Sequence, residues 1–218
     1  MTCANAAGGG HLECLAYAHE RGCPWNEYVC QWAAMLENPK CLQYAHEHGC
    51  PCSTLTGFAA ASHRRDSCLR YVLVHGCASG AGVCTAAAHA GSLACLTCAH
   101  EYNCPWDASV CAAAAQWSTI DCLKYLHKNG CPWDEKTCRT AARSGSLLCL
   151  QYAHENGCPW DSTTCEAAAL AGSMKCLRYA YARGCPLLPL ATVHMGHLKS
   201  LYPLVASFVY RHTTKATL

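Results

Sequence analysis

The stretch Asp134–Trp160, with the sequence DEKTCRTAARSGSLLCLQYAHENGCPW, is one complete unit of a repeat that runs through most of the chain. The dipeptide Cys-Leu inside it recurs seven times at intervals of 27 residues, with no insertion between units. A second cysteine series runs unbroken from Cys23 to Cys185 at the same interval. A third runs from Cys3 to Cys165, with Gly57 in place of one cysteine. The three series contain 20 of the 22 cysteines and leave out Cys52 and Cys98.

Each unit predicts two helices. Asp134 has the side chain of an N-cap, which accepts a hydrogen bond from an unpaired amide at the start of a short helix through Ala142. A pair of alanines recurs in that helix in every unit, and this strict small size predicts close approach of a neighbouring helix. After a turn near Gly145, the apolar stripe from Leu147 to His154 predicts a second helix. Gly157 ends it, because glycine tolerates the left-handed backbone of a helix C-terminus.

A pair of helices this short cannot bury its own apolar stripe, but a stack of such pairs can. The sequence therefore predicts an all-α, right-handed solenoid of helical hairpins. We expect residues 1–187 to form a single domain of seven repeats and residues 188–218 to form a degenerate capping repeat. The opening of an outer helix recurs in that tail at Gly196-His197-Leu198-Lys199-Ser200.

Three segments carry a resemblance to a known family. The segments Gly10–Leu15 and Glu155–Gly157 resemble the outer helix of ankyrin repeats, and Ala168–Gly172 resembles the end of their inner helix. Ankyrin repeats have ~33 residues and a β-turn finger, whereas here Cys158-Pro159-Trp160-Asp161 leads directly into the next helix. The chain is similar to a shortened, cysteine-rich ankyrin-like class of large DNA viruses and protists. The resemblance implies an ankyrin-like fold without fingers.

Composition excludes several classes of protein. Apolar residues make up 52% of the chain and charged residues 14%, which is far from the composition of a disordered chain. The net charge of +2 gives no basis for a default nucleic-acid partner. No apolar run approaches the ~18–20 residues that span a bilayer, so we expect no membrane association. The first residues lack a signal-peptide pattern. We therefore expect a reducing compartment, the cytoplasm or nucleus, and the resemblance adds an infected host cell.

The cysteines allow three interpretations. Disulfides between equivalent cysteines are disfavoured, because helices in a stack lie ~8–10 Å apart and disulfide Cα atoms lie within ~7 Å. Cysteine is also a common buried residue, and reduced core cysteines would explain the pattern. The third interpretation is structural zinc, since cysteine and histidine together are typical zinc ligands. The predicted sets are Cys3, His19 and Cys23; Cys30, His46 and Cys50; Cys84, His100 and Cys104; Cys111, His127 and Cys131; and Cys138, His154 and Cys158.

Joint losses favour these sets. In the third unit the inner-helix cysteine is replaced by Gly57 and the histidine by Leu73, as expected if a site there was lost as a whole. The seventh unit has Tyr181 in place of histidine. Zinc and reduced core cysteine both stay open, the fourth ligand is not assigned, and either role is structural. No other cofactor is expected.

The sequence favours a non-catalytic protein–protein interaction scaffold. Its motifs are all repeated, and no phosphate loop, nucleophile elbow or paired-acid site is present. Solenoids bind partners with exposed positions that vary between units. The positions after the paired alanines vary in this way, and they predict a partner-binding set of Met35, His63, His89, Trp117 and Arg143. The alternative is a nucleic-acid-binding repeat protein, which would require basic or stacking residues at one position in every unit.

Overall fold

The computed structural model describes residues 3–77, 80–186 and 203–213. Within these ranges the chain forms fifteen α-helices and no strand. Helices α1 to α14 form seven consecutive pairs, as the repeat predicts. The segment expected to cap the array contributes α16 (Pro203–Thr213), while its predicted opening at Gly196–Ser200 lies outside the described residues.

Each pair consists of an inner and an outer helix. The inner helices are α1 (Cys3–Gly8), α3 (Glu27–Ala34), α5 (Thr54–Ser62), α7 (Ala81–Ala90), α9 (Ala108–Gln116), α11 (Glu135–Arg143) and α13 (Ser162–Leu170). The outer helices are α2 (Leu12–Glu20), α4 (Lys40–Glu47), α6 (Asp66–Val74), α8 (Leu93–Glu101), α10 (Ile120–Lys128), α12 (Leu147–Glu155) and α14 (Met174–Ala182). None of the described helices is long and apolar enough to cross a bilayer.

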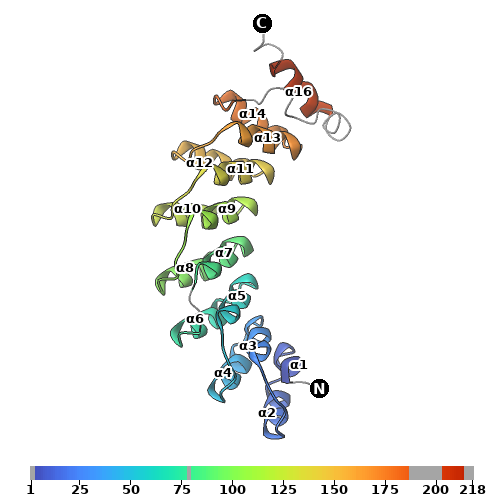
Figure 1. The fold of residues 1–218 in the computed structure, drawn as a ribbon, viewed down its shortest axis with the longest axis vertical. Coiled ribbons are helices and arrows are strands. Elements are labelled where there is room, and N and C mark those ends of the chain that lie inside the picture. The colour runs from blue at the N-terminus through green and yellow to red at the C-terminus, as the bar shows by residue number, and fades with distance from the viewer. Residues whose placement is uncertain (1–2, 78–79, 187–202, 214–218) are drawn as a thin grey trace. The chain divides into compact units, whose positions relative to one another are not determined.

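The chain divides into two compact units, Met1–Trp106 and Asp107–Leu218. In the first unit α1, α3, α5 and α7 pack in one row, while α2 packs on α4 and α6 on α8 (Figure 1). In the second unit α9, α11 and α13 form the inner row, α10, α12 and α14 form the outer row, and α16 contacts α13. Each unit is therefore a stack of helical hairpins, an all-α solenoid fold in which linkers without strands take the place of β-turn fingers in the described residues.

The helix ends follow the predicted capping residues. Asp134 accepts a hydrogen bond from the amide of Lys136 at 3.0 Å, and Asn26, Asp107 and Asp161 cap their helices in the same way. Gly157, just after an outer helix, has a φ of 84°. A Cβ atom added there would meet nothing within 4 Å, so backbone conformation rather than space selects glycine. Asn103 takes the equivalent place with a φ of 55°.

The paired alanines set the separation of the inner helices. Ala141 and Ala142 on α11 are fully buried, and α11 packs against both α9 and α13. The helices approach so closely that the Ser144 hydroxyl donates a hydrogen bond to the carbonyl of Ala115 at 3.1 Å. Leu123 and Leu150 fill the space between inner and outer helices, also fully buried. Alanine therefore packs between neighbouring inner helices, and leucine packs between the inner and the outer helices.

Substituting Ala141 by leucine should destabilise the second unit. The extra atoms have no space between packed backbones, and overpacking of this kind typically costs ~1–3 kcal/mol. Thermal unfolding followed by circular dichroism measures the effect. The control is Lys136→Leu on the exposed face of the same helix, which should change the stability by less than ~0.5 kcal/mol. Equal melting temperatures for both variants would contradict the packing described here.

Candidate functional site

Successive linkers are tied together by thiol hydrogen bonds. The thiol of Cys158 donates to the carbonyl of Asp134 at 3.2 Å, which links one Cys-Pro-Trp-Asp segment to the segment before it. The same bond joins Cys50 to Asn26, Cys131 to Asp107 and Cys185 to Asp161, at 3.1–3.4 Å. Thiols are weak donors, and here they add a second hydrogen bond to N-cap carbonyls that already accept an amide of their own helix. The unbroken cysteine series therefore has a structural function in the linkers.

The inner-helix cysteines form hydrogen bonds in the same hairpins, to the carbonyls of the linker cysteines. Cys138 donates to the carbonyl of Cys158 at 4.0 Å, and the equivalent bonds have lengths of 3.6–3.9 Å from Cys3, Cys30, Cys84 and Cys165. The interaction between the Cys111 and Cys131 thiols, together with burial, raises the pKa of Cys111. The same interaction lowers the pKa of Cys131, although burial acts in the opposite direction. All 22 cysteines are free thiols. The structure thus brings together the two cysteines of the predicted zinc sets as reduced pairs.

The recurring histidine lies elsewhere. His127 stacks on Trp133, with ring centroids 4.1 Å apart, and its Nδ1 lies 3.0 Å from the hydroxyl of Tyr152 in the next hairpin. The equivalent stacks are His19 on Trp25, His100 on Trp106 and His154 on Trp160, at 3.7–4.0 Å. The signature Tyr-Ala-His-Glu-Asn-Gly-Cys-Pro-Trp thus places an aromatic ladder along the linkers. Stacking of this kind explains why these residues recur together.

The predicted zinc sets are therefore only partly assembled. Their cysteines pair, but four of the five histidines stack on tryptophan, and the fifth, His46, faces Tyr71 and Cys77. In the parts of the chain that the structure describes, no group of three or more His, Cys, Asp or Glu side chains is arranged to hold a metal ion. Metal binding at these sets stays a prediction, and it requires the imidazoles to leave their present partners.

Cys52 differs from every other cysteine. It stands 27 residues after Trp25, in the position where four of the linkers have tryptophan. Its interaction with the thiol of Cys30 contributes most to lowering the pKa of Cys52 to about 6. Burial is the main reason that the pKa of Cys77 is raised to about 12. The cysteine series did not reveal this position. The tryptophan series would have revealed it, because Cys52 interrupts that series.

The predicted partner-binding residues lie at the ends of inner helices. Trp117, which is 54% exposed, and Arg143 line one hollow of about 330 Å³ in the second unit. Met35 is half-buried beside Trp32 in a similar hollow between α1 and α3. His63 and His89 are exposed, and Nδ1 of His63 lies 2.9 Å from the carbonyl of Ala59. Partner binding by these residues stays a prediction.

A second exposed group lies on the inner helices of the first unit. Trp32 on α3 is 40% exposed, Phe58 on α5 is 47% exposed, and Tyr28 and Leu55 are more exposed still. A hollow of about 230 Å³ runs beside Phe58 and Leu55 toward α7. We call Tyr28, Trp32, Leu55 and Phe58 the aromatic face. The positions of Tyr28 and Phe58 are occupied by Lys136 and Arg139 on α11, so this face is specific to the first unit.

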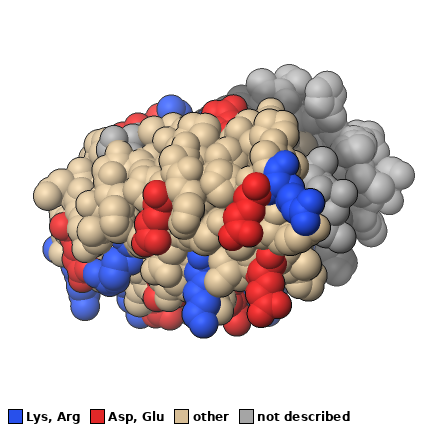
Figure 2. Space-filling view, turned by 90° about the horizontal axis from the view of Figure 1, so that it is seen from below, with Lys and Arg blue, Asp and Glu red and all other residues tan. Residues whose placement is uncertain are grey.

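Charge is sparse on the surface. Figure 2 shows single Lys, Arg, Asp and Glu side chains of both signs scattered among uncharged residues on the face that it views. The ion pairs found in the described residues lie at the surface, such as Arg65 with Glu37 at 3.1 Å. Exposed pairs of this kind contribute little to stability. The face in Figure 2 therefore presents no basic stripe of the type that follows a nucleic-acid backbone.

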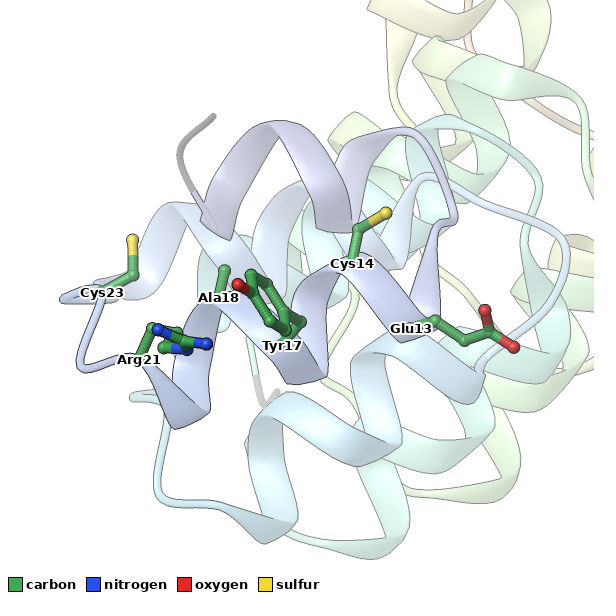
Figure 3. A pocket seen from close by; sticks show the side chains of 6 residues that line it. All are labelled: Glu13, Cys14, Tyr17, Ala18, Arg21 and Cys23. Carbon is green, nitrogen blue, oxygen red and sulfur yellow. The ribbon is translucent and has the colours of Figure 1, made fainter.

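Another hollow lies on the outer helix of the first hairpin. It measures about 640 Å³ and is lined by Cys14, Tyr17, Arg21 and neighbouring side chains (Figure 3). The Arg21 guanidinium lies over the Tyr17 ring, 5.1 Å from its centroid. Cys14 is exposed, whereas its equivalents in later hairpins, such as Cys41, are buried. The hollow is thus the face that a preceding outer helix covers in the rest of each stack.

Comparisons with known proteins agree with the fold. No protein-family model matches the sequence, and a search of curated proteins finds no match. The human ASB11 ankyrin repeat domain is similar in structure, with a TM-score of 0.55, 17% identity and coverage of 85% of both chains. The maize pentatricopeptide repeat protein PPR10 aligns with a TM-score of 0.44 and 15% identity, over 99% of this chain and 39% of that protein. The chain therefore has an ankyrin-like helical-repeat fold.

Removing one stacked tryptophan should lower the stability of the second unit. Trp133→Ala deletes the ring that stacks on His127 and contacts Tyr152, and it should cost ~1–3 kcal/mol from lost stacking and burial. Chemical denaturation measures this change. Leu148→Ala is the control, since that side chain is 66% exposed on the neighbouring α12. A Trp133→Ala protein as stable as this control would show that the stack is incidental.

Proposed function

We propose that the protein is a non-catalytic scaffold that binds another protein through the inner helices. The observation that carries this proposal is the aromatic face of the first unit. Trp32 and Phe58 lie on adjacent helices and are almost half exposed. Exposed aromatic residues beside hollows are typical anchors of protein interfaces. The expected partner is a protein with an apolar segment, because the four residues of the aromatic face are uncharged.

The ankyrin-like fold supports this proposal without determining it. Stacked hairpins present a row of inner helices whose exposed positions change from unit to unit while the core is kept. Trp117 and Arg143 place a second hollow on the inner helices of the other unit. The repeated cysteines and histidines are occupied in hydrogen bonds and stacks of the linkers, which supports a structural rather than a catalytic role for them.

We further propose the finer assignments that the sequence suggests. The shortened unit and the Tyr-Ala-His-Glu-Asn-Gly-Cys-Pro-Trp signature support membership of the cysteine-rich ankyrin-like class of large DNA viruses and protists. Free thiols throughout support a reducing compartment, the cytoplasm or nucleus, including that of an infected host cell.

Structural zinc at the predicted sets is a separate proposal, supported by the paired thiols and by the joint loss at Gly57 and Leu73. Elemental analysis of protein purified under reducing conditions should find about five zinc ions per chain, one for each complete set. Zinc should be lost as the pH falls, because protons compete for thiolate and imidazole. A metal content near zero, with a melting temperature that a chelator leaves unchanged, would assign the cysteines to the core as reduced thiols.

The scaffold proposal is tested by comparing captured proteins. Wild-type protein and the double variant Trp32→Ala, Phe58→Ala are used as baits, and quantitative mass spectrometry identifies specific partners. We expect at least one partner to be reduced tenfold or more in the variant, since each anchor contributes about 1–2 kcal/mol to a typical interface.

The matched control for this experiment is Tyr102→Ala, which removes an exposed aromatic ring from the end of an outer helix. It should retain the partners. Identical partner sets for all three baits would contradict the aromatic face as a binding site. A gel shift with single-stranded RNA and DNA at low salt tests the nucleic-acid alternative, and we expect no shift.

A further inference from the structure

Positive charge on the described inner helices is concentrated on α11. Lys136, Arg139 and Arg143 all lie there, and none of the other six inner helices has a lysine or an arginine. Their spacing of i, i+3 and i+7 places the three side chains on one face of the helix. Of the two neighbouring helices, α9 has no charged residue and α13 has one, Glu166. The positive charge of this inner row therefore belongs to one helix face.

Two of these cations have no counter-ion in the fold. Lys136 lies 3.9 Å from the carboxylate of Asp134. In the residues that the structure describes, Arg139 and Arg143 form no ion pair and no side-chain hydrogen bond. Like charges four residues apart on a helix repel one another and lower its stability. The stability of the fold therefore does not explain this pair, and a bound anion would relieve the repulsion.

The nearby acidic residues leave both arginines available. Glu135 lies in the first turn of α11, where the helix dipole favours negative charge. Glu166 occupies on α13 the position that Arg139 has on α11. Neither carboxylate forms an ion pair with Arg139 or Arg143. Because Glu166 would repel a carboxylate placed over α13, it confines the acidic groups of a ligand to α11.

An apolar side chain is exposed on each side of the arginines. Trp117, just after α9, is 54% exposed, and Leu170, at the end of α13, is 41% exposed. Both helices pack on α11 (Figure 1). Trp117 and Arg143 line the hollow of about 330 Å³, and Ser144 in its wall is held by a hydrogen bond to the carbonyl of Ala115. The surface thus presents an aromatic ring, two guanidinium groups and a leucine in succession.

We propose that this surface binds an acidic peptide with an apolar residue on each side of its acidic centre. The proposal rests on the proposed function as an interaction scaffold, and it gives the second unit a partner of different chemistry from that of the aromatic face. Glutamate or aspartate side chains of the peptide pair with Arg139 and Arg143, since a guanidinium group binds a carboxylate through two parallel hydrogen bonds. One apolar residue enters the hollow beside Trp117, and the other covers Leu170.

The helix spacing sets the spacing within the peptide. Packed helices lie ~8–10 Å apart, and an extended chain advances ~3.3 Å per residue, so about three residues cross one helix. An extended peptide that crosses α9, α11 and α13 therefore has its two apolar residues about six positions apart, with the acidic residues between them. Arg139 and Arg143 are one helical turn apart, ~5–6 Å between their Cβ atoms, so consecutive acidic residues reach both.

An acidic peptide fits this surface better than a nucleic acid does. Nucleic-acid sites follow the phosphate backbone with an extended basic patch or stripe, whereas the unpaired cations here are two side chains on one helix. Phosphate binding also gives no role to the exposed Leu170. Carboxylates flanked by apolar side chains match both the charge and the apolar parts of the surface.

The test measures binding of the fluorescein-labelled peptide Leu-Ser-Glu-Glu-Glu-Ser-Leu to the full chain by fluorescence anisotropy. We expect saturable binding that weakens as salt is added, because exposed charges are screened. The double variant Arg139→Gln, Arg143→Gln should weaken binding about tenfold or more, since it removes both charge pairs. Trp117→Ala should weaken it about threefold or more, since it removes the ring beside the hollow.

Two altered peptides test the same contacts on the wild-type chain, so the result does not depend on how a variant folds. Replacing the three glutamates by glutamine should weaken binding as much as the arginine variant does. Replacing both leucines by serine should weaken it about threefold or more, because the apolar contacts are lost.

The matched control is Lys175→Gln with Arg178→Gln, which removes two exposed cations from the outer helix α14 of the same unit. It should bind the peptide as the wild type does, and circular dichroism should show equal melting temperatures for both charge variants. The aromatic-face variant Trp32→Ala, Phe58→Ala should also bind the peptide normally. Loss of peptide binding and loss of captured partners therefore report separately on this inference and on the scaffold proposal.

Four outcomes would overturn the inference. The first is the absence of saturable binding, and the second is equal binding of the glutamate and glutamine peptides. The third is equal binding of the leucine and serine peptides, which would reduce the contact to charge attraction alone. The fourth is displacement of the labelled peptide by single-stranded RNA at a lower concentration than by unlabelled peptide, which would assign the arginines to phosphate.

Discussion

The hydrogen bond from the Cys158 thiol to the carbonyl of Asp134 is the interaction that a 27-residue unit depends on. The Asp134 carbonyl also accepts the first hydrogen bond of its own helix, from the amide of Thr137 at 3.0 Å, so the thiol adds a second bond that joins one linker to the linker before it. Longer ankyrin repeats use a β-turn finger at this place. Here a side chain one residue beyond the helix-ending Gly157 replaces about six residues of backbone, and the stacked Trp160 ring closes the surface beside it.

Much of this fold could be predicted from the sequence, because its determinants are local. Asp134 and Gly157 mark the helix ends by side-chain and backbone chemistry that depends on a few neighbours. The alanine pair indicates that the neighbouring inner helix packs closely. The partners of His127 were not predictable in this way. Whether its ring meets a thiol or Trp133 depends on the path of the linker, and periodicity fixes only which helix face the histidine occupies.

The sites that sequence reasoning missed are those where a unit departs from its own pattern. Cys52 was set aside because it lies outside the cysteine series, but counted from Trp25 it replaces a tryptophan. Phe58 was missed for another reason. Exposure on an inner helix is set by how neighbouring hairpins cover it, and no property of the single helix reveals that. The repeated residues explain the stacked fold, and the residues that depart from the repeat mark the candidate sites.

The exposed surface around Cys14 has a consequence for how such chains change over generations. It is the same surface that interior hairpins bury against the hairpin before them, as the covered equivalent Cys41 illustrates. A whole unit gained or lost by recombination at its boundaries would leave every remaining junction with matching faces. The array can therefore be lengthened or shortened in steps of 27 residues without a new core, while single substitutions within one unit, such as Cys52 or Phe58, are free to acquire individual roles.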